Sequence, residues 1–156
     1  MRALALVAAI AMVASLFLPW LNPGTSGIRL VPWDMLKELE LSADGLRTFA
    51  TDSPPELLAF LATFALAALF GLLTLIGAPS RLLAFLAGGG ALGFLGYGLL
   101  QMKDQAAAAG IPVPGTDDLA EFAKSAPEIF GMGAFAWAGG ALVLFLAALI
   151  GFGDRR

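Results

Sequence analysis

Long uninterrupted runs of apolar residues alternate with short polar segments along this chain. Four runs have no ionisable residue in their interiors, and they cover residues 3–21, 57–78, 82–102 and 129–152. A helix of about 20 residues crosses a hydrocarbon layer ~30 Å thick, because each helical residue adds ~1.5 Å. The pattern therefore predicts an all-α fold, an integral membrane protein built as a four-helix transmembrane bundle.

The polar segments between the runs differ in length. Residues 22–56 and 103–128 form two outer segments, whereas residues 79–81 form a tight inner loop. The whole chain, 1–156, is then a single membrane domain without room for a separate soluble one.

Each outer segment also contains apolar residues at helical spacing. Pro32 suits the first turn of a helix, and Trp33 and Leu36 follow it three residues apart. A second helix is predicted in 103–128, beginning near Thr116. We expect short amphipathic helices on the outer face, with their apolar sides toward the membrane.

The second and fourth runs are preceded by the same pattern, Ser-x-Pro-Glu, at residues 53–56 and 125–128. A serine followed three residues later by glutamate is typical of a capping box, and proline suits the first helical turn. The repeated pattern has two interpretations: an internal duplication, or two hairpins that share only a common way of starting a helix.

Residues 1–20 can also be interpreted as a secretory signal peptide. Arg2 gives a basic start, and Val13-Ala14-Ser15 resembles a cleavage site. The apolar run continues to Leu21, however, which is long for a signal peptide and suits a membrane span. We therefore expect the first span to be retained.

Charge predicts the orientation of the bundle. Arg2, Arg81, Arg155 and Arg156 lie directly beside the ends of apolar runs, whereas nearly all the acidic residues lie in the outer segments. Basic residues beside spans favour the cytoplasmic side, so both termini are expected there. The alanine- and glycine-rich spans suggest a bacterial inner membrane, and the acidic outer face argues against nucleic acid as a partner.

Cysteine and histidine are both absent from the sequence. Their absence excludes disulfides, thiol catalysis and histidine-ligated metals. Asp117, Asp118 and Glu121 share one helical turn, but acidic residues also suit a helix N-terminus. We expect no catalytic residues, metal or cofactor, and we interpret the protein as non-enzymatic.

Small residues recur on one side of each run, where they allow helices to approach closely. The predicted packing residues are Ala59, Thr63, Ala67, Gly71, Gly89, Gly93, Gly96, Ala136 and Gly140. These faces serve either packing within the chain or lateral contact with another membrane protein.

Tyr97, Gln101 and Trp137 are the most distinctive polar and aromatic residues within the spans. They have two interpretations. They line a pocket for a lipid, quinone or pigment, or they pack against the glycine-rich third span, where the indole N–H needs a partner.

The layout of the first outer segment resembles that of the claudin-like four-span proteins. The resemblance rests on Trp20 after the first span and on residues 27–33, which end in a tryptophan. The paired cysteines and the Gly-Leu-Trp triplet of that family are missing here. The resemblance implies topology only.

The leading hypothesis is a non-catalytic accessory or structural subunit that packs against a larger membrane complex or self-associates. Its predicted partner contacts are Trp33, Leu36, Phe49, Leu119 and Phe122. The alternative is a small carrier or channel for an uncharged or lipidic solute, with a cavity beside the third span.

Overall fold

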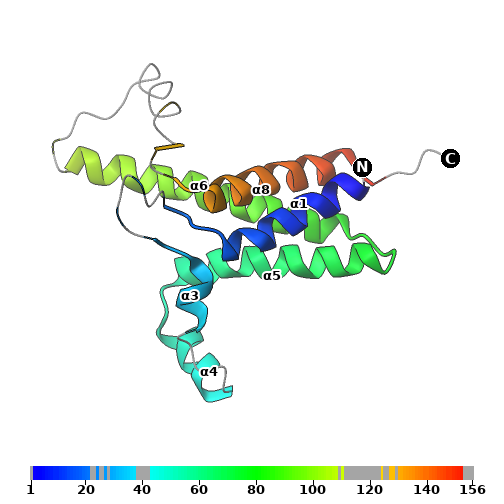
Figure 1. The fold of residues 1–156 in the computed structure, drawn as a ribbon, viewed down its shortest axis with the longest axis horizontal. Coiled ribbons are helices and arrows are strands. Elements are labelled where there is room, and N and C mark those ends of the chain that lie inside the picture. Colours follow the sequence, from blue (N-terminus) through cyan, green and yellow to red (C-terminus); the bar gives the residue numbers. More distant parts are fainter. Residues whose placement is uncertain are drawn as a thin grey trace.

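The computed structural model describes residues 2–21, 24, 27, 29–37, 43–108, 110, 124, 127, 128 and 130–152. The described residues form long helical stretches that pack side by side, and shorter helices project from one end of this bundle (Figure 1). The bundle consists of α1 (Arg2–Ala14), continued by the 3-10 turn η1 (Ser15–Phe17), α5 (Pro55–Leu75), α6 (Arg81–Ala108) and α8 (Met132–Ile150).

The four stretches form a ring in which each packs against two others. Helix α1 packs against α5 and α8, and α6 packs against the same two helices. Helices α5 and α8 therefore lie at opposite corners of the bundle. The start of α1 and the turn between α5 and α6 lie at one end, here called the Arg81 end because α6 begins at Arg81 (Figure 1). The opposite end is called the Trp20 end.

Three of these helices are long and apolar enough to cross a membrane: α5, the Arg81–Gln101 part of α6, and α8. The first stretch, Arg2–Phe17, is apolar but shorter. Helix α6 continues beyond the predicted span end at Met102 as far as Ala108. The predicted all-α fold is confirmed for the described residues, where an isolated bridge between Leu21 and Phe130 is the sole β feature.

Small residues bring α8 close to two of its neighbours. A Cβ atom on Gly140 would lie 2.7 Å from the Ala8 carbonyl oxygen of α1. A Cβ atom on Gly88 would lie 2.6 Å from the Ala141 carbonyl oxygen of α8. Neither position has space for a methyl group, so both contacts require glycine.

Within the chain, the third span does not pack through its predicted face, and lateral contact with another membrane protein through that face stays a prediction. Gly93 and Gly96 are exposed, and no atom lies within 4 Å of a Cβ built on either. Gly89 only borders the ring of Phe145, at 3.4 Å. The α6 face in the core carries Ala84, Ala87, Gly88 and Ala91 instead.

The predicted packing residues of the other spans agree better with the residues that are buried in the structure. Thr63, Ala67 and Gly71 of α5 are buried, and Gly140 of α8 is buried as well. Ala136 is partly buried, whereas Ala59 is exposed and does not take part in the core. The α5 stripe therefore begins one turn later than predicted.

Two short helices project from the Trp20 end: α3 (Pro32–Lys37) and α4 (Ala43–Asp52). Together they are called the α3–α4 arm. Pro32 is the first residue of α3, as predicted, and α3 packs against η1. The arm runs across the direction of the bundle helices and extends past α5 (Figure 1). The second predicted outer helix lies outside the described residues.

The predicted capping box at the start of α5 is wrong. The N-cap residue is Pro54, without a side-chain hydrogen bond, and the Ser53 N–H instead donates to the Phe49 carbonyl of α4. The predicted proline in the first turn is confirmed. Two prolines already suit this helix start, because they lack the N–H groups that a cap would satisfy.

Candidate functional site

Two extended segments far apart in the sequence lie side by side at the Trp20 end. The Gly131 N–H donates to the Trp20 carbonyl oxygen at 2.8 Å, and the Gly133 N–H donates to the Pro19 carbonyl oxygen at 3.0 Å. The bridge between Leu21 and Phe130 continues the pairing. This arrangement, here called the clasp, joins the end of the first helical stretch to the start of α8.

The two glycines of the clasp cannot carry side chains without moving the backbone. A Cβ atom on Gly131 would overlap the Pro19 carbonyl oxygen. A Cβ atom on Gly133 would lie 2.6 Å from Cδ1 of Trp20. We did not predict these roles, since the sequence only marks both residues as glycines near a helix start.

Trp20 makes two further hydrogen bonds within the clasp region. Its backbone N–H donates to the Leu30 carbonyl oxygen at 2.8 Å, which fixes the segment leading into α3. Its indole Nε1–H donates to the Ser15 carbonyl oxygen at 2.8 Å. Ser15 is fully buried, and its hydroxyl donates to the Met12 carbonyl oxygen at 2.6 Å.

An aromatic cluster fills the bundle beneath the clasp. The rings of Trp20, Phe60, Phe64, Phe94 and Trp137 contact one another, with centroids 5.0–6.4 Å apart. These separations are typical of favourable aromatic pairs. The cluster draws on Trp20, just after the first helical stretch, and on α5, α6 and α8. It therefore connects the end of the first stretch with the other three helices of the bundle.

The polar atoms inside this cluster are satisfied within the chain. Trp137 is 2% exposed, and its Nε1–H donates to Thr63 Oγ1 at 3.2 Å. The Thr63 hydroxyl donates in turn to the Phe60 carbonyl oxygen at 2.7 Å. Among the described residues, each buried side-chain nitrogen or oxygen has a hydrogen-bond partner. The cluster therefore offers no free polar group to a ligand.

The structure does not assemble the predicted pocket of Tyr97, Gln101 and Trp137. Tyr97 is 47% exposed, and its hydroxyl oxygen accepts a hydrogen bond from Gln101 Nε2 at 2.6 Å, along the outside of α6. The ring contacts of Trp137 are with the aromatic cluster. Helix phase explains the difference, because Tyr97 lies six residues beyond the buried Ala91, which places it about 120° around α6 from that residue.

An apolar groove of about 480 Å³ lies between α1 and α5, away from the third span where a cavity was predicted. We call it the α1–α5 groove. Its lining contains no polar side chain and consists of Ala9, Ile10, Val13, Ala14, Phe17, Ala67, Ala68, Gly71, Leu72 and Leu75. The small residues among them were a usable signal, since Ala67 and Gly71 belong to the predicted stripe.

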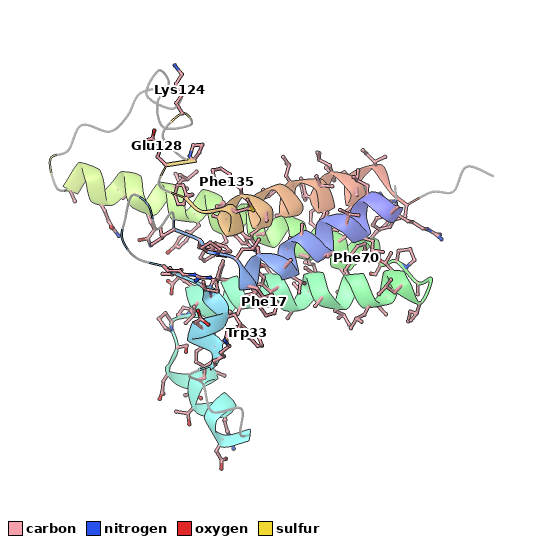
Figure 2. All side chains as sticks on the ribbon, in the orientation of Figure 1. Phe17, Trp33, Phe70, Lys124, Glu128 and Phe135 are labelled. Carbon is pink, nitrogen blue, oxygen red and sulfur yellow. The ribbon has the colours of Figure 1, made fainter. Side chains whose placement is uncertain are left out.

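The groove and the arm meet at an aromatic contact. The rings of Phe17, in the groove, and Trp33, on α3, are tilted against each other with centroids 4.9 Å apart. Figure 2 shows the two side chains at the junction of the bundle and the arm.

The predicted partner-contact residues can be located in part. Trp33 is 38% exposed, while Leu36 and Phe49 are partly buried. Leu119 and Phe122 lie outside the described residues. The arm also carries an exposed ion pair, in which Lys37 Nζ lies 3.1 Å from Asp34 Oδ1. Within the part of the chain that the structure describes, no three Asp or Glu side chains gather where a metal ion would bind.

At the Arg81 end, one arginine holds the last turn of α8. Arg81 Nε and Nη2 donate to the Ala148 carbonyl oxygen at 3.1 and 3.0 Å, and Nη2 also donates to the Leu149 carbonyl oxygen at 3.1 Å. The last carbonyls of a helix have no partners within the helix, and a cation there also complements the helix dipole.

No known protein family, curated protein or solved structure matches this chain.

Proposed function

We propose that this chain is a four-span membrane protein that acts as a non-catalytic accessory or structural subunit. In this proposal Arg2–Phe17, the first helical stretch, crosses the membrane in addition to the three longer helices. Its position supports the assignment, because α1 packs against both α5 and α8, two helices long enough to cross a membrane. Ala5, Ala9 and Met12 of α1 have no exposed surface.

The orientation with both termini in the cytoplasm is part of the proposal. Arg2 and Arg81 lie at the same end of the bundle, and basic residues beside spans favour the cytoplasmic side. The arm then lies on the outer face, and a bacterial inner membrane remains the proposed location.

The observation that carries the subunit proposal is the α3–α4 arm. It leaves the bundle at Trp33, extends past α5 and presents aromatic and charged side chains outside the four-helix core (Figures 1 and 2). Within the bundle, the hydroxyl groups of Ser15, Thr63 and Thr74 donate to carbonyl oxygens of their own helical segments. Contact with another membrane protein, or with a second copy, is the function that such an arm supports best.

The test is association in the native membrane. The protein is extracted in a mild detergent, and the proteins that remain bound are identified by mass spectrometry. Trp33→Ser combined with Phe49→Ser should release the bound partner, whereas Thr48→Ala, an exposed change on the same arm, should not. If the double variant folds and retains every partner, the arm is not the contact surface.

A small carrier for a lipidic solute is the second candidate. The α1–α5 groove favours it, because its volume of about 480 Å³ falls within the roughly 300–1,000 Å³ of small-molecule pockets. The test is the transfer of a fluorescent phospholipid between the two leaflets of liposomes that contain the protein. Transfer no faster than in protein-free liposomes excludes this candidate.

A further inference from the structure

We infer that the α1–α5 groove binds one acyl chain of a phospholipid from the leaflet at the Trp20 end. The inference rests on the proposed membrane position of α1 and α5, but it does not depend on the subunit role, because it is argued from the shape and chemistry of the groove. The bound lipid would be a fixed part of the folded protein in the membrane.

The groove is closed at its floor and open at its side. Ala9 and Ala67 have no exposed surface, and a Cβ atom on Gly71 would lie 3.9 Å from the Cβ of Ala9. The rims are large side chains, since Ile10 is 55% exposed and Leu72 is 62% exposed. The groove thus opens toward the surroundings of the bundle and does not lead into its core.

A groove of this shape binds hydrocarbon through packing. Lipid chains are as apolar as leucine, so a membrane helix gains little from burying apolar surface alone. Atoms that line a void lose dispersion contacts on that side, and a chain lying between the two walls restores them. With no polar side chain in the lining, an acyl chain can occupy the groove without desolvating any polar group.

The dimensions favour an acyl chain over a helix from another protein. The exposed lining of the groove is a small fraction of the ~800 Å² that each partner buries in a stable protein interface. The groove alone is therefore too small to hold a helix of another protein in a stable complex.

The Trp20 end of the groove has the features of a membrane–water boundary. Phe17 and Trp33 contact each other there, and tryptophan favours the headgroup level, where its ring is partly in hydrocarbon. One turn along α3 from Trp33, the Asp34–Lys37 pair places both signs of charge in an exposed position. That combination suits a zwitterionic headgroup better than an anionic one.

The test uses the full-length protein in phosphatidylcholine vesicles that contain a little phosphatidylcholine spin-labelled on one acyl chain. Electron paramagnetic resonance then counts the motionally restricted lipids per protein. Ala68→Phe fills the groove from α5 and should remove a restricted lipid. Ala62→Phe makes the same change on an exposed face of α5 outside the groove, and it should match the wild type.

A second variant guards against a folding defect. Ala14→Phe fills the groove from the opposite wall, at an exposed residue, and should reproduce the loss. The inference is overturned if both folded variants keep the wild-type number of restricted lipids. It is equally overturned if they keep that number but lose a protein that co-purifies with the wild type, since the groove would then hold a protein segment.

Discussion

The indole N–H of Trp137 donates a hydrogen bond to Thr63 Oγ1, and this bond joins α8 to α5 across the bundle. Both residues are almost fully buried, at 2% and 4% exposure. The Thr63 hydroxyl also donates to the Phe60 carbonyl oxygen, so it has a defined direction when it accepts from Trp137. One hydroxyl group therefore satisfies a buried indole and connects two opposite corners of the structure.

Replacing Thr63 with valine should destabilise the bundle by about 0.5–2 kcal/mol, because the buried indole N–H loses its acceptor. Denaturation by sodium dodecyl sulfate in mixed micelles would measure the change. Thr74→Val is the matched control, since the Thr74 hydroxyl bonds only to the Phe70 carbonyl of its own helix. Equal losses in the two variants would show that the contact between helices contributes nothing.

Gly88→Ala should destabilise the protein by about 1–3 kcal/mol through overpacking, because the new methyl group meets the backbone of α8 at Ala141 and Phe145. Gly93→Ala should have little effect, as no atom lies within 4 Å of its Cβ position. The same micelle denaturation compares them. A larger loss for Gly93→Ala would restore the packing face predicted from the sequence.

Gly133→Ala should open the clasp, because a Cβ atom at this position collides with the Trp20 ring and the Leu18 carbonyl oxygen. The rings of Trp20 and Trp137 have centroids 5.4 Å apart, so their coupled transitions should give a circular dichroism couplet. We expect the couplet to weaken in Gly133→Ala and to persist in Gly139→Ala, which has open space at its Cβ. An unchanged couplet in both variants would contradict the clasp geometry.

Arg81→Gln should loosen the last turn of α8, because the carbonyls of Ala148 and Leu149 lose their guanidinium donors. Complementing a helix dipole contributes about 0.3–1 kcal/mol at an exposed site. Hydrogen exchange should therefore accelerate at the Gly151 amide, which bonds to the Ala147 carbonyl oxygen. Arg47→Gln, on the arm, removes the same charge and should leave this amide unaffected.

The positions of the long helices could be predicted from the sequence because they depend on composition. Apolar runs long enough to cross a membrane are typical of transmembrane helices, and Pro32 indicated the start of α3. The side of the third span that packs in the core could not be predicted from the glycines alone. Gly88, Gly89 and Gly90 are consecutive, so together they point around more than half of the helix.

A better signal for that face was present in the alanines. Ala84, Ala87, Gly88 and Ala91 follow the spacing i, i+3, i+4 and i+7 of a single helix face, and all four are buried. Gly93 and Gly96, which continue the run of glycines, indicated a different face of the helix.

The candidate site was predictable only in part. Trp137 was recognised as a buried residue that needs a partner, but its acceptor on α5 depends on how the helices are rotated. The clasp has no local signature, because Trp20 and Gly131 are separated by most of the chain. The α1–α5 groove depends on the relative positions of two helices, which their separate sequences do not determine.

The clasp also sets an order of events during biosynthesis. A ribosome completes the first helical stretch long before it reaches Gly131, so the carbonyls of Pro19 and Trp20 wait without these donors while α3, α4, α5 and α6 emerge. The Trp20 end can close only when α8 has been inserted. A chain that stops early stays open at this end, and that open end distinguishes it from a finished molecule.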